Sequence, residues 1–539
     1  MLKPSVLFVC CLGVAVAGHH AFAGPYDAPA GYYDSATGTG ATLESQLRSI
    51  MASGHIQRSY GDFRYSAKIT DADPDRPGNI LLVYDRLSVD GDWDSGSTWD
   101  REHVWPQSQQ PGSASNSTRG NLGDPHALRP SLPATNSRRG NDPFGLGNTT
   151  GNHRRVGSYY FPGDADKGDI ARQLFYSSTR YSLDLVNGNP GSNQMGDLAS
   201  LIAWHYLDTP DEFERGRNHK IYSQSLNPNY YTNNRNAYID RPELAWSVFV
   251  DQQNDSQIGV AGGSSLGNGA TSLSVDLGQV FVGGAGPGTR TVTVDKTGQD
   301  GTYYGLSASG LLTGVEVDRP RAFAVGGSDR DQFTLGLAAN SNSAGAFTGR
   351  LTVDNLDVTT QGGAGRGAND ADDVIDLTYT VFDHATASFS ADREATSGQL
   401  DFGSVTAGAS GDEARRVFSI FNLEATAGFT SALSVGTWTA VSGDTSVLSL
   451  VDGDQAEPDL AAGQSLLQAA QVDASVAAGN YSATWSLAVG DALQLPGAQA
   501  GALLLTLTAQ IVPEPAAAVL LLLSLGLCLL HRRAQRPAA

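Results

Sequence analysis

The chain has 539 residues, 40% of them hydrophobic, and a formal net charge of −21 at pH 7. This length is too great for one hydrophobic core, so two to four domains are expected, and 63 glycines favour a part rich in β-strands and turns. Residues 251–539 carry 13 basic and 30 acidic side chains, which excludes this half as a binding surface for a polyanion. Within residues 101–180, basic side chains outnumber acidic ones by 10 to 6, so nucleic acid is tolerated there.

The N-terminus has the pattern of a secretory signal peptide. Lys3 precedes an apolar run over residues 6–17, and Ala21-Phe22-Ala23 provides a small-x-small cleavage site before Gly24. Residues 1–23 are therefore predicted to be removed on export. The three cysteines are Cys10, Cys11 and Cys528, all in apolar terminal segments. The folded part would contain no disulfide, and any metal site in it must use oxygen or imidazole ligands.

Residues 24–253 are predicted to form an α+β domain. Helical spacing of apolar residues indicates helices over 42–53, around 170–175 and over 197–206, and a capping box with proline at its first helical position predicts another helix from Thr209. Segments 79–89 and 99–105 are each predicted to be one strand, the second ended by Pro106. The cluster that begins at Asp124 is predicted to be an ordered loop that enters a short helix.

Beyond residue 253, alternating strands and glycine turns replace helical spacing. Residues 275–283 (VDLGQVFVG) and 400–408 (LDFGSVTAG) form a repeat at a constant offset of 125 residues. The number and spacing of the strands predict two all-β sandwiches, over 254–384 and 385–511, that resemble the immunoglobulin-like modules of bacterial surface proteins.

The last segment, residues 512–539, has the pattern of a sorting signal. Pro513-Glu514-Pro515 precedes an apolar run over 516–530, and His531, Arg532 and Arg533 follow. A plain membrane anchor is one interpretation, because the basic flank obeys the positive-inside rule, although the apolar helix is short for a full span. The three-part pattern resembles the PEP-CTERM signals of Gram-negative bacteria. That resemblance implies an exosortase-type sorting enzyme, transient contact with the inner membrane, and a final place at the cell surface or outside the cell.

One short stretch has the residues needed for phosphodiester hydrolysis. This reaction requires a base for water, a cation on the phosphate oxygens and help for the leaving oxygen. Histidine is the natural base near neutral pH, and Mg²⁺ prefers oxygen ligands such as a carboxylate and an amide. Mn²⁺ or Ca²⁺ are alternatives. The residue types occur together in Glu102, His103, Asp124, His126, Asn136, Arg138 and Arg139.

Five motifs in a fixed order resemble the endonuclease I family of secreted bacterial nucleases over residues 30–250. They are REHVWPQS, GDPHALRP, NSRRGNDPFG, FPGDADKGDIARQLFYSSTRY and NNRNAYIDRPELAW. The resemblance implies a ββα-metal (His-Me finger) core and cleavage of DNA, and often of RNA, with little regard for sequence, leaving a 5′-phosphate and a 3′-hydroxyl. It further implies that His103 activates water, that Glu102 and Asn136 hold one Mg²⁺, and that Arg139 contacts the phosphate.

Other residues of the cluster have weaker assignments. Arg101 and Arg138 are predicted to bind substrate, although a solvated charge is an equal interpretation of Arg138. Three residues, His126, Asp124 and Asn141, are predicted to be structural. Adjacent residues of a regular strand point to opposite faces, so Glu102 and His103 cannot both face one site unless the strand ends or twists there.

These patterns together predict an exported, Mg²⁺-dependent endonuclease carried by two acidic β-modules and an apolar C-terminal helix, with no protein partner evident. Two alternatives stay open. One is a surface adhesion or binding protein whose nuclease fold is inactive, and the other is a secreted ribonuclease. The sequence does not separate DNA from RNA, because contacts to phosphates carry no signature of the 2′-hydroxyl.

Overall fold

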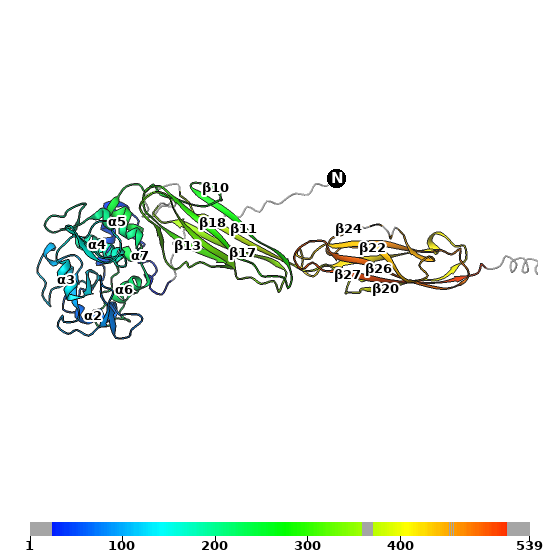
Figure 1. Ribbon diagram of the computed structural model, residues 1–539, viewed down its shortest axis with the longest axis horizontal. Helices are drawn as coiled ribbons and strands as arrows, with labels where there is room; N and C mark the ends of the chain where they lie inside the picture. Colours follow the sequence, from blue (N-terminus) through cyan, green and yellow to red (C-terminus); the bar gives the residue numbers. More distant parts are fainter. Residues whose placement is uncertain (1–23, 358–369, 452, 454, 456, 515–539) are drawn as a thin grey trace, which may run out of the picture. The chain divides into compact units, whose positions relative to one another are not determined.

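The computed structural model describes residues 24–357 and 370–514, except 452, 454 and 456 (Figure 1). The predicted signal peptide and the apolar run of the predicted sorting signal lie outside these residues. In the part that is described, no helix is both long and apolar enough to span a membrane.

The chain divides into two compact units. The first unit consists of the residues up to Val275 together with Thr289–Gly336 and Gly349–Leu377. The second unit consists of Asp276–Gly288, Leu337–Thr348 and the residues from Thr378 onward. The first unit therefore contains the whole N-terminal α+β part together with strands of the first β-module. The domain borders predicted at 253 and 384 do not coincide with this division and stay predictions.

The N-terminal part contains helices joined by short antiparallel or parallel strand pairs. Its helices are α1 Gly40–Ala52, α2 Phe63–Thr70, α3 Pro133–Arg139, α4 Lys167–Tyr181, α5 Leu198–Leu207, α6 Glu212–Tyr222 and α7 Ala237–Asp240. Its strand pairs are β1 Asn79–Leu81 with β2 Ser88–Asp90, β3 Asp100–His103 with β4 Leu128–Ser131, β5 Arg154–Val156 with β6 Tyr159–Phe161, and β7 Asp184–Leu185 with β8 Gln194–Met195.

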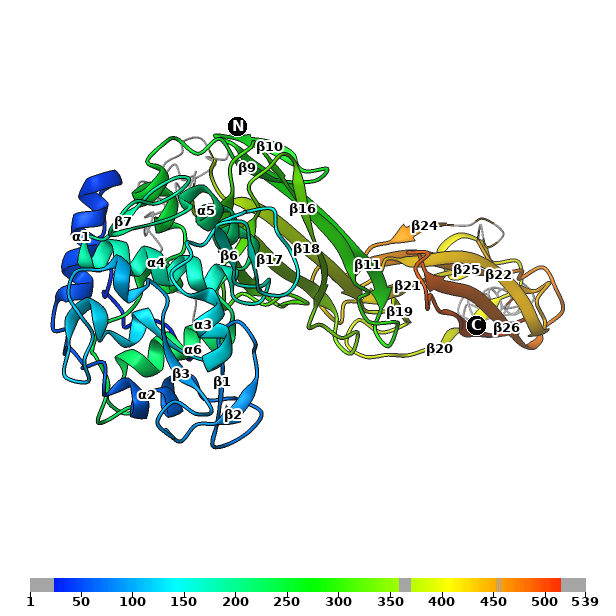
Figure 2. The ribbon, with the colours of Figure 1, turned by 60° about the vertical axis from the view of Figure 1, so that its left-hand side comes forward.

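Helix α1 shows why the sequence folds as it does. Leu43, Leu47 and Met51 recur at helical spacing and are fully buried, which confirms the helix predicted over 42–53. The buried face packs into a core that includes residues of α4 and α5. Figure 2 shows α3 next to β3, which follows from the short connection between β4 and α3.

Two predicted elements in this part are wrong in detail. Residues 79–89 form a hairpin instead of one strand, because the backbone turns where Tyr84 and Arg86 adopt φ of 71° and 51°. Helix α6 begins at Glu212 and not at Thr209. Asp211 caps it, since the Asp211 carboxylate accepts a hydrogen bond from the backbone N–H of Glu214 at 2.7 Å.

The C-terminal part is all β, as predicted, and has four large sheets. The first module has one sheet in the order β10 Ser264–Gly267, β11 Ala270–Phe281, β18 Asp373–Phe382, β17 Gly345–Asn355, β13 Thr302–Gly310, β15 Arg321–Phe323, and another in the order β14 Leu312–Thr313, β16 Asp329–Leu337, β12 Arg290–Thr297, β9 Gln257–Val260. The second module has one sheet in the order β19 Thr386–Ser388, β21 Arg415–Leu423, β25 Ser465–Val472, β23 Leu448–Leu450, and another in the order β20 Ser397–Thr406, β27 Ala500–Val512, β26 Gly479–Asp491, β22 Leu433–Gly443, β24 Glu457–Leu460.

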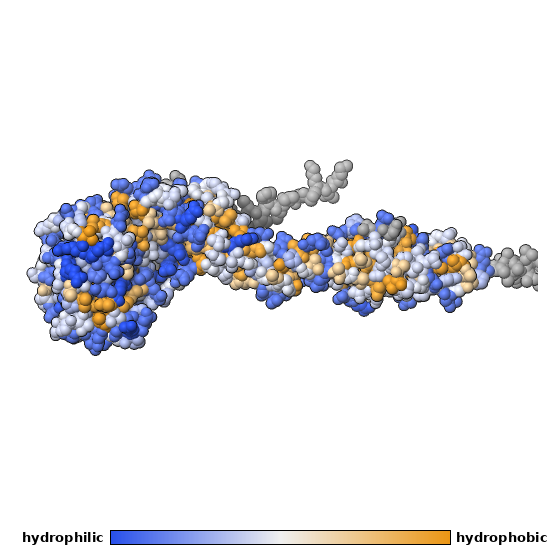
Figure 3. All heavy atoms as spheres, viewed as in Figure 1, coloured by the Kyte–Doolittle hydropathy of each residue, from blue (hydrophilic) through white to orange (hydrophobic). Residues whose placement is uncertain are grey.

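The core of the second module lies between its two sheets. Ile420 and Ala470 come from one sheet, while Val435, Leu487 and Leu505 come from the other, and all belong to a single buried cluster. This arrangement is that of a β-sandwich. On the face drawn in Figure 3, hydrophobic residues form separate patches between hydrophilic ones.

The predicted repeat has the same local structure in both copies. Asp276 accepts a hydrogen bond from the N–H of Gly278 at 2.8 Å, and Asp401 accepts one from Gly403 at 3.0 Å. Both glycines have positive φ, 110° and 71°, which a side chain would disfavour. The conserved spacing of aspartate and glycine in the repeat therefore encodes one kind of turn within β11 and β20.

Candidate active site

Strand β3 carries the central residues and presents them on two faces. It pairs with β4 so that Glu102 lies opposite Arg129 and His103 opposite Leu128. Because side chains alternate along a strand, Asp100 and Glu102 share one face, and Arg101 and His103 share the other. Helix α3 follows β4 and places Asn136 and Arg139 against the face that carries the carboxylates.

One nitrogen of the His103 ring is engaged in a hydrogen bond. Its Nε2 lies 3.0 Å from the carbonyl oxygen of Leu122, and a carbonyl can only accept, so the neutral ring carries its hydrogen on Nε2. The lone pair is then on Nδ1, which no described residue contacts by a hydrogen bond. Tyr60 stacks on the ring, with centroids 4.7 Å apart and planes at 24°.

Electrostatics keep this ring neutral. Burial lowers the pKa of His103 to about 4, the hydrogen bond to Leu122 acts in the opposite direction, and the positive charges of Arg101 and Arg139 lower the pKa further. At neutral pH the Nδ1 atom can therefore accept a proton, which is what a general base requires.

Glu102 is buried, with one carboxylate oxygen occupied. Its Oε1 accepts a hydrogen bond from the Tyr84 hydroxyl at 2.7 Å and lies 3.6 Å from Nε of Arg139. Burial raises its pKa, Arg139 and Tyr84 counteract this, and the Asp100 carboxylate adds to the rise. No described residue donates a hydrogen bond to its Oε2.

Asn136 faces the same carboxylates. Its Nδ2 is 3.4 Å from Oδ2 of Asp100, which leaves the amide Oδ1 without a hydrogen-bond donor among the described residues. Glu102, Asn136 and Asp100 thus offer oxygen atoms, the ligand type that Mg²⁺ prefers, and the chemistry of the donor set fits such an ion. No group of three or more His, Cys, Asp or Glu suited to a metal occurs in the described residues, so waters and phosphate would have to complete the coordination.

The comparisons with known proteins concern this same region. The family model "Endonuclease I" matches residues 39–243. The chain is 37% identical over 244 residues to the extracellular ribonuclease of Bacillus subtilis (strain 168), which covers 42% of this chain and 81% of that protein. The chain belongs to the endonuclease I family. Its N-terminal part is a nuclease domain, and the protein is an enzyme.

Other similarities add less. The extracellular ribonuclease of Bacillus amyloliquefaciens is 37% identical over 242 residues, covering 40% of this chain and 78% of that protein. Among solved structures, the adhesive subunit of the CFA/I fimbria of enterotoxigenic Escherichia coli is 10% identical with a TM-score of 0.24, covering 45% of this chain and 98% of that one. Cadherin domains 3–6 of protocadherin gamma B2 are 12% identical with a TM-score of 0.26, covering 49% and 54%. These scores are too low to assign the β-modules of this endonuclease I protein to a fold.

Two arginines that are neighbours in the endonuclease I domain have different surroundings. Arg139 is 1% exposed; it donates to the carbonyls of Val104 at 2.7 Å and Gly140 at 3.2 Å, and it lies over the ring of Phe144. In this position it braces β3 against α3. Arg138 is exposed and has no ion-pair partner among the described residues, so it is the better placed of the two to meet a phosphate.

The residues predicted to be structural lie as follows. Asp124 is buried and accepts hydrogen bonds from the hydroxyls of Tyr176 at 2.7 Å and Tyr181 at 2.6 Å. His126 Nε2 lies 3.2 Å from the carbonyl oxygen of Asn234, which ties the loop before β4 to the chain far downstream. Asn141 is exposed just beyond α3.

Sequence reasoning missed three residues of the site: Asp100, Tyr84 and Tyr60. Asp100 had a signal, because a carboxylate two positions before Glu102 must share its strand face. Tyr84 and Tyr60 had none, since each reaches β3 from another part of the chain.

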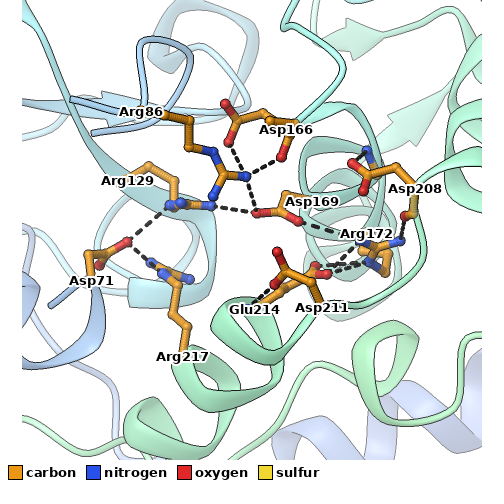
Figure 4. Close-up of polar contacts among 12 residues, drawn as sticks. Asp71, Arg86, Arg129, Asp166, Asp169, Arg172, Asp208, Asp211, Glu214 and Arg217 are labelled. Carbon is orange, nitrogen blue, oxygen red and sulfur yellow. Dashed lines mark hydrogen bonds and ion pairs between the residues drawn. The ribbon is translucent and has the colours of Figure 1, made fainter. Parts of the chain in front are cut away.

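A buried network of arginines and carboxylates supports the site from behind (Figure 4). Arg129 of β4 pairs with Asp71 at 3.0 Å and with Asp169 at 3.3 Å. Asp166 pairs with Arg86 at 2.8 Å and accepts the backbone N–H of Tyr84 at 2.9 Å. The network therefore positions both β4 and the tyrosine that contacts Glu102. Further members in Figure 4 are Arg172, Asp208, Asp211, Glu214 and Arg217.

Proposed function

We propose that the endonuclease I domain hydrolyses internal phosphodiester bonds of nucleic acid outside the cell, with a divalent ion and with little regard for sequence. The observation that carries this proposal is the buried, neutral His103, whose Nε2 is engaged by Leu122 and whose Nδ1 is free to take a proton. Two relatives that are named extracellular ribonucleases, together with the predicted signal peptide, support export.

Strand β3 ends at His103, so the His103 ring is not bound to the alternation of the strand and can serve the same phosphate as Glu102. In the proposed mechanism, Nδ1 of His103 removes a proton from a water molecule as its oxygen attacks phosphorus. The P–O3′ bond breaks, which leaves a 5′-phosphate and a 3′-hydroxyl once the leaving oxygen is protonated. Glu102 and Asn136, with Asp100 beside them, would hold Mg²⁺. When bound, this ion would neutralise charge on the phosphate and on the leaving oxygen. Arg138, which is exposed on α3, would contact the phosphate.

RNA is a second candidate substrate, and one observation favours it: both curated relatives are named ribonucleases. DNA stays the substrate predicted from the motifs. The β-modules and the predicted PEP-CTERM signal would display the enzyme at the cell surface, with an exosortase as partner. The adhesion alternative has no such observation in its favour.

The test uses the chain with supercoiled plasmid and with RNA, in Mg²⁺ or in chelator. His103→Ala is expected to lose cleavage by about 10² to 10⁴-fold, the usual contribution of a general base. Asn136→Ala is expected to regain activity at higher Mg²⁺, which His103→Ala cannot. Persistence of nicking in His103→Ala would refute the assigned base, and absence of nicking in every chain would refute the proposed activity.

A further inference from the structure

The surface beside His103 combines aromatic rings with guanidinium groups. The guanidinium of Arg101 lies 3.7 Å from the centroid of the Tyr60 ring, which itself stacks on His103. Arg101 donates to the carbonyl of Tyr60 at 2.9 Å, and Arg64 donates to the next carbonyl, that of Gly61, at 2.8 Å. The two cations are therefore held side by side on consecutive peptide groups.

This surface continues away from His103 along α2. Arg64 lies over the ring of Tyr65 at 5.4 Å, and Tyr65 stacks on Tyr230 with planes at 21° and centroids 5.9 Å apart. Although it contacts Arg64 and Tyr230, Tyr65 is still 52% exposed. We call Tyr60, Arg64, Tyr65, Arg101 and Tyr230 the stacking surface.

The arginines of the stacking surface differ from the buried ones in their charge balance. Arg129, Arg172 and Arg217 each have a carboxylate partner. Among the described residues, neither Arg64 nor Arg101 forms an ion pair. Their charge is left to attract an anion, within a protein that is acidic overall. Asp100, the carboxylate next to Arg101 in the chain, accepts the backbone N–H of Arg101 at 2.6 Å, and its side chain lies on the other face of β3.

We propose that the stacking surface binds the unpaired nucleotides of a single-stranded nucleic acid as it leads to His103, an inference that rests on the proposed function. An aromatic ring can stack on a base only where that base is exposed. Removing one such ring from a protein weakens its binding of single strands markedly. A duplex keeps its bases stacked inside and would leave Tyr65 unused. The pairing of exposed tyrosine with unpaired arginine thus fits single strands, with Arg64 and Arg101 on phosphates.

The test measures binding of the full chain in chelator, with a labelled single strand of about twelve nucleotides, within the range of known single-strand sites, and with a duplex of the same sequence. Tyr65→Leu removes the aromatic face at similar volume, and Tyr65→Phe retains it. We expect the natural chain to prefer the single strand, Tyr65→Leu to bind it about 10-fold more weakly, and Tyr65→Phe to bind it as the natural chain does. Duplex binding should be equal in all three.

Equal binding of single strand and duplex, or equal effects of Tyr65→Leu and Tyr65→Phe, would overturn the inference. If Tyr65→Leu also lowers the melting temperature, Arg64→Gln tests the inference instead. Losing one phosphate contact should reduce by about 0.7 the slope of the logarithm of the single-strand binding constant against the logarithm of salt concentration. An unchanged slope counts against the inference. Cleavage in Mg²⁺ is measured separately: single-strand binding through Tyr65 without any cleavage would refute the proposed function and leave this inference standing.

Discussion

The carbonyl oxygen of Leu122 determines which nitrogen of His103 can act as a base. Without that hydrogen bond the hydrogen could sit on either ring nitrogen, and part of the neutral population would present the wrong one. Tyr84 has the corresponding role for Glu102, because its hydroxyl occupies Oε1 and leaves Oε2 without a hydrogen-bond donor among the described residues. Neither positioning residue lies in the motif that contains Glu102 and His103.

Tyr84→Phe should therefore weaken metal binding with little change in fold. Removing a hydrogen bond to a ligand commonly costs about 10- to 100-fold in metal affinity. Calorimetric titration with Mn²⁺ would measure it, and the Mg²⁺ needed for half-maximal cleavage should rise in parallel. Tyr160→Phe is the matched control, since its hydroxyl contacts His153 and not Glu102. Equal Mn²⁺ affinity in Tyr84→Phe and the natural chain would contradict the role given to Tyr84.

His205 predicts how stability depends on pH. Burial lowers its pKa to about 3, Arg172 lowers it further, and the hydrogen bond to Pro242 opposes this. Because its pKa in the unfolded chain is near 6.5, the unfolded state binds the extra proton below that pH, so acidification favours unfolding until pH reaches about 3.

From pH 7 to pH 5 this group alone should remove about 2 kcal/mol from the free energy of unfolding. His205→Gln, which can keep the hydrogen bond to Pro242, should show a pH dependence shallower by that amount in urea titrations. Parallel curves for the two chains would show that His205 titrates normally in the folded protein.

Strand β4 depends on buried charges for its position. Arg129 is 1% exposed and is the residue opposite Glu102, so any displacement of Arg129 moves β3. Residues 24–514 contain no cysteine, and the ion network links the end of α2, β4, α4 and α6.

Arg129→Met should destabilise the nuclease domain by about 3 to 5 kcal/mol, because it removes one cationic partner from each of the buried carboxylates of Asp71 and Asp169. Denaturant unfolding would measure the loss. Arg155→Met is the control: Arg155 pairs with Asp142 at the surface, where little stability is at stake. Similar effects of the two substitutions would mean that the network contributes no more than a surface pair.

Elements with strong periodicity could be predicted from the sequence, and those set by distant contacts could not. The spacing of Leu43, Leu47 and Met51 was sufficient for α1. The hairpin over residues 79–90 was not predicted, because its turn places Tyr84 and Arg86 at positive φ, a conformation in which glycine is the usual residue. Arg138 and Arg139 look equivalent in sequence, yet α3 turns the first to solvent and the second into the core.

At the scale of the molecule, the nuclease domain and the first β-module share a core. Tyr303 of β13 belongs to the same buried cluster as Trp204 and Tyr206 of α5. Its hydroxyl donates to the carbonyl of His205 at 2.5 Å, and Asp357 accepts hydrogen bonds from both Tyr206 and the backbone of Tyr303. The family match ends at residue 243 and the predicted domain at residue 253, so neither indicates that the core extends into the first β-module.

A chain shortened after Val250 should therefore be less stable than the nuclease domain in the full chain. Exposing the site of Tyr303 forfeits about 2 kcal/mol for one aromatic side chain, which corresponds to about 5 °C in melting temperature for a domain of this size. Scanning calorimetry would compare the two. A shortened chain that melts at the same temperature as the nuclease transition of the full chain would show that the shared core contributes nothing.

The shared core also decides where proteolysis could free a working enzyme. A protease that cuts between Val250 and Gln257 would sever the peptide but leave Tyr303 lodged beside Trp204, so the two fragments would stay together as a nicked complex. Release of the nuclease domain with its shared core intact would require cleavage after the first β-module, beyond Phe382.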